Sequence, residues 1–75
     1  MLVIEQILES LKDGEWRDLD EIVEKTRISK LKVEIVTGFL EEYGFIQLDK
    51  EGGRAKLTPA MLNFFNQLSR DFYSI

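Results

Sequence analysis

Six of the ten cationic side chains in this 75-residue chain lie in two short stretches. The first stretch holds Arg27, Lys30 and Lys32, and the second holds Lys50, Arg54 and Lys56. Within the two stretches the only acidic residue is Glu51. Clustered lysine and arginine side chains can neutralise phosphates, and each neutralised phosphate adds a salt-dependent contribution to affinity. We therefore expect these residues to contact phosphates. The alternative is that they form a solvated surface whose positive charge balances the acidic rest of the chain.

The rest of the chain is acidic. Residues 1–26 carry eight acidic and three basic residues, whereas residues 27–75 carry six and seven. The formal net charge is −4 and the sequence pI is about 4.7, although DNA-binding domains are usually basic. The charge therefore leaves two kinds of partner open, a nucleic acid held by the two basic stretches and another protein.

The residue types exclude several classes of enzyme. The chain has no cysteine and no histidine, which rules out disulfides, the usual zinc sites, thiol nucleophiles and Ser-His-Asp triads. Ser29 and Thr58 have no histidine base to activate them, so we interpret both as helix caps. The acidic residues show no calcium-loop pattern and are interpreted as solvated helix faces. We expect no enzymatic activity, no cofactor and no metal.

The length corresponds to one domain spanning residues 1–75. With 44% hydrophobic and 32% charged residues, the composition is that of an ordinary globular protein. No leader peptide is recognisable at the N-terminus, and no apolar run approaches the roughly 20 residues of a membrane span. The absence of cysteine is typical of intracellular proteins, so we expect a cytoplasmic location.

Two helices are expected in the first third of the chain, over residues 2–12 and from 19 to 25 or 26. The first has apolar residues at helical spacing, and Asp13-Gly14 ends it. For the second, Asp18 followed by Glu21 predicts a start that resembles a capping box. Between the helices, residues 15–17 are expected to be extended, with Trp16 at the edge of the core.

A third helix is expected from a Ser29 cap to about Tyr43. The residues expected to face the core are Leu31, Ile35, Val36, Phe39, Leu40 and Tyr43. Those expected on the opposite side are Lys30, Glu34, Thr37, Gly38 and Glu41, with Lys32 and Val33 at the margins. A glycine inside a helix costs about 1 kcal/mol relative to alanine, and it can permit a close approach by another backbone.

The last third predicts a β-hairpin and a helix. Strands are expected at residues 45–48 and 54–57, with Gly52-Gly53 supplying positive φ in the turn. Thr58-Pro59 predicts a capped helix that reaches about Tyr73. Its apolar face is broad for so small a domain, so we expect a homodimer through this helix, with helix 1 of the partner as a further contact. The residues of this predicted interface are Phe64, Phe65, Leu68 and Phe72, which would otherwise complete the monomer core.

Taken in order, these elements resemble the MarR, ArsR and PadR-like winged-helix transcriptional regulators. The residues that carry the resemblance are Asp18 to Val23, Ile28-Ser29, Leu40 with Gly44-Phe45-Ile46, Gly52-Gly53, and Leu57-Thr58-Pro59. The resemblance covers nearly the whole chain. It implies a mainly helical α+β fold, a winged helix-turn-helix with a three-helix core, a β-hairpin wing and a C-terminal helix.

In this family the third helix enters the DNA major groove and the wing contacts phosphate. The resemblance therefore implies the DNA-binding residues Arg27, Lys30, Lys32, Val33, Thr37, Lys50, Arg54 and Lys56. Val33 and Thr37 would meet base edges, and the cations would hold the backbone. Glu34 and Glu41 depart from the pattern, because exposed carboxylates repel phosphate.

Two hypotheses follow. The first is a homodimeric transcription regulator that binds double-stranded DNA. The second is a winged-helix module that binds protein within a larger transcription or replication assembly, since one fold serves many functions.

Overall fold

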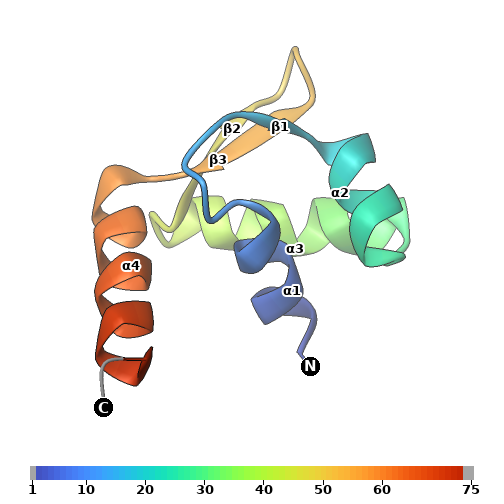
Figure 1. The fold of residues 1–75 in the computed structure, drawn as a ribbon. Coiled ribbons are helices and arrows are strands. Elements are labelled where there is room, and N and C mark those ends of the chain that lie inside the picture. The colour runs from blue at the N-terminus through green and yellow to red at the C-terminus, as the bar shows by residue number, and fades with distance from the viewer. Residues whose placement is uncertain (1, 74–75) are drawn as a thin grey trace.

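The computed structural model describes the backbone of residues 2–73 and the side chains of residues 2–67. This part of the chain forms four helices and a three-stranded antiparallel sheet, which confirms the expected mainly helical α+β fold. The elements are α1 (Val3–Ser10), β1 (Arg17–Asp18), α2 (Leu19–Thr26), α3 (Lys30–Glu42), β2 (Ile46–Asp49), β3 (Arg54–Leu57) and α4 (Pro59–Tyr73). Figure 1 shows α1, α2 and α3 gathered on one side of the sheet, with α4 at one end. Within the described backbone, no helix is long and apolar enough to cross a membrane.

The sheet has the order β1-β3-β2, so the second strand of the hairpin is central. β2 and β3 pair with Ile46 opposite Leu57, four residue pairs in all. The extended piece expected at residues 15–17 pairs as β1 over Arg17 and Asp18, with Arg17 opposite Ala55. Ile46, Ala55 and Leu57 are buried, so one face of the sheet covers the helices.

The core draws side chains from the first three helices, from the turn before α3 and from the sheet. Its buried members are Ile7, Leu8, Leu11, Ile22, Ile28, Val33, Leu40, Ile46, Ala55 and Leu57. The three from residues 7–11 belong to the apolar stripe predicted for the first helix. This core holds α2 and α3 beneath the hairpin.

Two of the three predicted helix caps form. The Ser29 Oγ accepts a hydrogen bond from the Lys32 N–H at 3.3 Å, and the Thr58 Oγ1 accepts one from the Met61 N–H at 3.3 Å. The Thr58 hydroxyl also donates to the Gly44 carbonyl at 2.9 Å, which ties the start of α4 to the end of α3. Asp18 stands at the N-cap of α2, but its side chain makes no capping hydrogen bond, so that prediction is wrong.

Helix α3 turns a different face to the core from the one its apolar pattern predicted. Val33 and Thr37 are 0% and 1% exposed, whereas four of the six residues expected to face the core are 48–69% exposed. Those exposed residues are Leu31, Ile35, Phe39 and Tyr43. The other two, Val36 and Leu40, contact the core as expected. Apolar residues lie on both sides of α3, so their period alone cannot select the packed face. Burial of Thr37 leaves no polar group unpaired, because its hydroxyl donates to the Val33 carbonyl at 2.7 Å.

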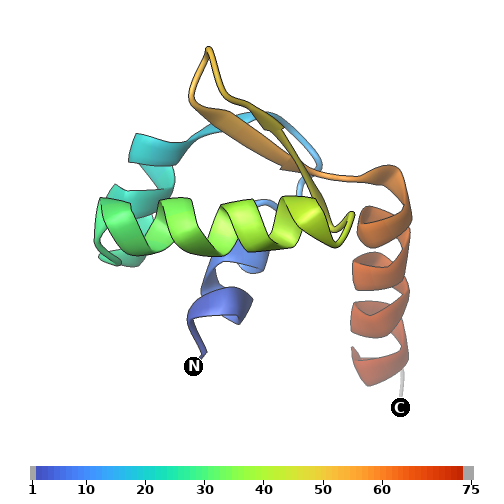
Figure 2. The ribbon, with the colours of Figure 1, turned by 180° about the vertical axis from the view of Figure 1, so that it is seen from behind.

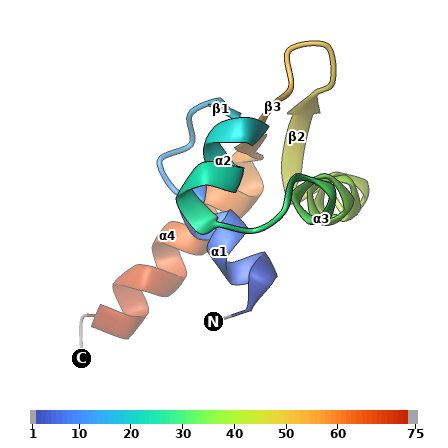
Figure 3. The same cartoon turned by 90° about the vertical axis from the view of Figure 1, so that its right-hand side faces the viewer.

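Helix α4 begins against the core and then leads away from the other helices (Figures 1 and 3). Leu62 and Phe65 pack on the core cluster, whereas Phe64 is 59% exposed. The side chains of Leu68 and Phe72, which complete the predicted dimer interface, lie outside the described residues.

Candidate interaction surface on helix α3

Three of the predicted phosphate-binding cations form ion pairs within the domain. The Lys30 Nζ lies 2.9 Å from the Asp20 Oδ1, which joins the start of α3 to the start of α2. The Arg54 Nη2 lies 2.9 Å from the Asp49 Oδ2 across the hairpin. The third pair links Lys50 to Glu41 at 3.9 Å. A carboxylate therefore compensates each of these three charges locally.

The two shorter ion pairs also shift the acid–base equilibria of their members. The hydrogen bond to Asp20 raises the pKa of Lys30. The hydrogen bond from Arg54, together with one from the Gly52 N–H, lowers the pKa of Asp49. Both shifts favour the charged forms, so the pairs persist at neutral pH.

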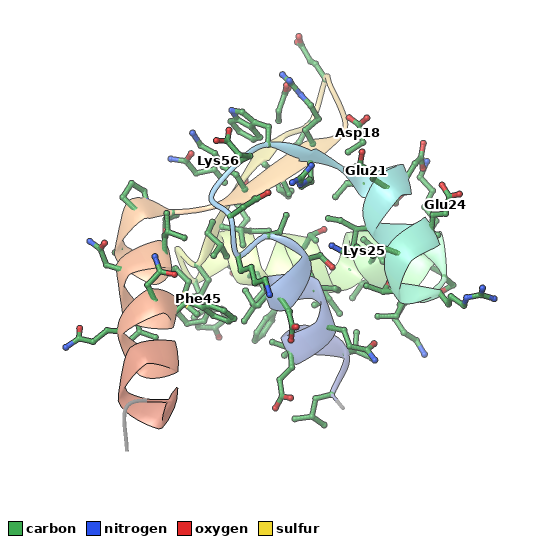
Figure 4. All side chains as sticks on the ribbon, in the orientation of Figure 1. Asp18, Glu21, Glu24, Lys25, Phe45 and Lys56 are labelled. Atoms are coloured by element: carbon green, nitrogen blue, oxygen red, sulfur yellow. The ribbon has the colours of Figure 1, made fainter. Side chains whose placement is uncertain are left out.

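Trp16 lies beside two cations of the hairpin, Lys56 and the ion-paired Arg54. The Lys56 Nζ lies 4.9 Å from the Trp16 ring centroid, and the Arg54 Cζ lies 5.5 Å from it. At these distances the ring quadrupole attracts both cations. The indole is 37% exposed, so these two side chains cover it at the edge of the fold. Figure 4 shows Lys56 on the sheet toward α4, whereas Asp18 and Glu21 lie toward α2.

The other four predicted DNA-binding residues divide into two pairs. Arg27 and Lys32 are exposed and take part in none of the ion pairs found among side chains 2–67. Arg27 ends α2 with φ of 62°, and Lys32 lies in the first turn of α3. The expected outward orientation of Val33 and Thr37 is wrong, because both side chains are buried in the core and cannot reach a base edge from there.

The outer face of α3 carries Leu31, Ile35, Phe39 and Tyr43, which we call the apolar ridge. A spacing of four residues aligns these side chains along the helix over about 18 Å. The ring centroids of Phe39 and Tyr43 are 4.7 Å apart, and Phe45 continues the row at 6.4 Å from Tyr43. Figure 2 shows α3 lying across this side of the molecule, with the hairpin rising above it. The residues of the ridge are recognisable in the sequence, but their apolar character predicted that they would be buried in the core.

A groove of about 1000 Å³ runs along the hairpin side of α3, between α3, the start of α2 and the hairpin. We call it the acidic groove. The carboxylates that line it are those of Asp18, Asp20, Glu34, Glu41, Glu42 and Asp49. Two ammonium groups oppose these six carboxylates, those of Lys30 and Lys50. Arg54 pairs with Asp49 from outside the groove, so the groove keeps a surplus of three negative charges.

Gly38 lies where the apolar ridge meets the acidic groove. It follows Ile35 by three residues and precedes Glu42 by four, which places all three on one side of the helix. A Cβ built on Gly38 would find no heavy atom within 4 Å outside its own helix backbone and chain neighbours. Neither packing within the domain nor a positive φ therefore requires glycine at this position.

No family model matches this chain, and neither a curated protein nor a solved structure shows significant similarity to it. Among the side chains of residues 2–67, no group of three or more acidic residues is arranged to hold a metal ion. The function of this surface must therefore be inferred from its residues, which form an apolar ridge bordered by carboxylates.

Proposed function

We propose that this chain is a winged-helix domain whose outer α3 face binds another protein. In support of the winged helix, the short turn at residues 27–29 joins α2 to α3, the β2–β3 hairpin follows, and α4 closes the chain. β1 adds a third strand to the hairpin, as the extended piece before α2 would in that fold. In a domain of this kind the exposed side of α3, which is the second helix of the helix-turn-helix, and the wing are the surfaces offered to a partner.

The observation that carries the proposal is the exposure of the apolar ridge. Two aliphatic and two aromatic side chains stand on the surface, each 48–69% exposed to solvent. Contiguous exposed apolar surface of this kind marks protein interaction sites, and aromatic residues are enriched in the centres of interfaces.

The charge beside the ridge favours a protein over a nucleic acid. Duplex DNA carries about one negative charge per 1.7 Å of its axis. A duplex lying along α3 would bring its phosphates to the acidic groove, where six carboxylates oppose two lysines. Three of the cations predicted to compensate phosphate are already engaged by carboxylates of the domain.

The apolar area of the ridge limits the binding free energy that it can contribute. Covering the exposed parts of its four side chains would contribute about 1–1.5 kcal/mol each, in total about 4–6 kcal/mol. A micromolar complex requires about 8 kcal/mol after the cost of association. The ridge therefore needs a second set of contacts, and the acidic groove is the surface next to it.

Selection from a displayed library of random peptides, each about 14 residues long to match α3, tests this function. We expect the selected peptides to lose binding to the Ile35→Ser, Phe39→Ser double variant. They should retain binding to Phe64→Ser, which removes an exposed aromatic residue from α4. Both sets of substitutions are on the surface, so the fold is preserved. Peptides that bind the ridge variant as well as the wild type would refute the proposal.

DNA binding is the second candidate function, and Arg27 and Lys32 favour it. Arg27 is exposed in the α2–α3 turn and Lys32 in the first turn of α3, and within the described side chains neither belongs to an ion pair. Anisotropy of labelled random duplex DNA at about 50, 100 and 200 mM salt tests it. The protein-binding proposal expects no duplex binding at about 100 mM salt, whereas the DNA-binding hypothesis expects binding that Arg27→Ala with Lys32→Ala weakens.

Homodimerisation through α4 stays a prediction, and it involves a different surface from the ridge. The exposure of Phe64 and the direction of α4 away from the core support it. A dimer of this kind would leave the apolar ridge of each protomer open.

A further inference from the structure

We infer that the partner segment is a basic amphipathic helix, which packs its apolar face on the apolar ridge and turns lysine or arginine side chains toward the acidic groove. This inference rests on the proposed function and adds the chemistry of the partner. Three observations support it: the spacing of the ridge residues, the glycine beside the ridge and the negative charge along its edge.

The ridge has the spacing and length that suit a helix. Side chains four residues apart form the ridges that interdigitate when two helices pack. From Leu31 to Tyr43 the ridge spans about 18 Å, which a helix of about 13 residues covers. An amphipathic helix with apolar residues at intervals of three and four presents a matching stripe.

Gly38 provides the room for close approach. Glycine inside a helix lowers helix stability, and nothing within the domain occupies the space that a side chain at this position would fill. A partner helix centred on Gly38 can approach the α3 backbone closely, while its neighbours Leu31 and Ile35 contact the partner's apolar face. An external contact therefore explains a glycine that internal packing does not.

The two edges of the ridge both favour cations. On the groove side, Glu34 and Glu42 flank Gly38 at four residues on either side, and neither belongs to an ion pair among the described side chains. The opposite edge is aromatic, with Phe39, Tyr43 and Phe45 in a row. Aromatic faces attract lysine and arginine. A basic partner therefore finds complementary groups on both edges. On the groove side an acidic partner meets only Lys30 and Lys50, which Asp20 and Glu41 already engage.

A second copy of this chain is a poorer occupant of the same face. In the described part of α3, Lys32 borders the ridge together with Glu34 and Glu42, and Lys30 is engaged by Asp20. Two copies packed through this face would bring two acidic grooves together with too few cations to balance them. Like charges that face each other across an interface are unfavourable, so the charge selects a different, basic chain.

Two designed peptides of about 14 residues provide the test, because they differ only in charge. Both form an amphipathic helix with the same leucine stripe, and the polar face is lysine in one and glutamate in the other. We expect the Leu/Lys peptide to bind the full chain at least about tenfold more tightly than the Leu/Glu peptide at about 50 mM salt. The difference should shrink at about 200 mM salt, because the groove is open to solvent. Fluorescence anisotropy of the labelled peptides measures both affinities.

A charge-matched pair of variants separates the groove from the overall acidity of the chain. Glu34→Gln with Glu42→Gln removes two charges beside Gly38, and Glu5→Gln with Glu9→Gln removes two exposed charges from α1. Helix α1 packs on the core through Ile7 and Leu8, whereas the ridge is on the exposed side of α3 (Figure 3 shows the two helices). We expect the first pair to weaken the Leu/Lys peptide by about fivefold and the second to leave its affinity nearly unchanged. Equal effects of the two pairs would show attraction to net charge and would overturn the inference.

The remaining outcomes separate this inference from the proposed function. Equal affinities of the two peptides, both lost in Ile35→Ser, Phe39→Ser, would overturn the basic partner and leave the ridge as a protein-binding site. Failure of both peptides to bind would also overturn the basic partner, while the library selection decides the function independently. As a second readout, Gly38→Leu should weaken the Leu/Lys peptide about tenfold without lowering the Tm. An unchanged affinity for that variant would exclude close approach at Gly38.

Discussion

Replacing Gly38 with alanine should stabilise the domain. Gly38 is an interior residue of α3, its φ is not positive, and a Cβ at this position meets no heavy atom within 4 Å beyond its own helix backbone and neighbours. Alanine therefore adds no clash and loses no contact. It removes the entropic cost that glycine adds to a helix by its freedom in the unfolded chain.

The size of the effect follows from helix propensity, about 1 kcal/mol between glycine and alanine in an exposed helix interior. In a domain of this length, 1 kcal/mol corresponds to a rise in Tm of about 4–8 °C. Urea unfolding followed by circular dichroism measures the free energy, and the slope with urea should not change, because the folded surface stays the same.

Gly44→Ala is the matched control. A Cβ at Gly44 is equally free of neighbours, but its φ is +77°, a conformation that costs an L-residue about 1–2 kcal/mol. The two variants therefore differ in backbone conformation and not in available space, and Gly44→Ala should lower the Tm. A Gly38→Ala protein less stable than wild type, or two shifts of the same sign, would refute this account of α3.

Three further predictions concern the packed face of α3, the hairpin and α4. Leu40→Ala should lower the free energy of unfolding by about 2–5 kcal/mol, because Leu40 is 1% exposed. Leu31→Ala on the exposed side of the same helix should change it by less than about 0.5 kcal/mol. Urea unfolding measures both variants, and a larger loss for Leu31→Ala than for Leu40→Ala would show that α3 is wrongly oriented. The lowered pKa of Asp49 means that its carboxylate stabilises the fold above its usual pKa of 3.8 and that this contribution is lost as the pH falls through the lowered value. Asp49→Asn should therefore destabilise the domain at about pH 6, and the difference in stability should shrink as the pH falls below 3.8. A difference between the two proteins that does not depend on pH would contradict the ion pair with Arg54. If α4 mediates a homodimer, the sedimentation coefficient of the wild type should rise with protein concentration, and that of Phe64→Ser should rise much less. A wild type that stays monomeric at all concentrations would exclude this dimer.

Local signals in the sequence were enough to place most elements. Ser29 and Thr58 cap α3 and α4 because a hydroxyl satisfies a free amide at a helix start whatever the rest of the fold does. Gly52-Gly53 placed the hairpin turn within the bounds found. Asp18 stands at the predicted N-cap position of α2, but its side chain makes no capping hydrogen bond.

The sequence by itself determined the composition of the surface but not its arrangement. It set the order of helices and strands, the excess of negative charge and the absence of catalytic histidine and cysteine. Helix α3 has apolar residues around most of its circumference, so local pattern could not decide which of them would be buried. Packing against α1, α2 and the hairpin chose Val33, Thr37 and Leu40, and it left the apolar ridge outside. The tertiary structure also brought carboxylates from α2, α3 and the hairpin to one groove, a proximity that sequence distance cannot reveal.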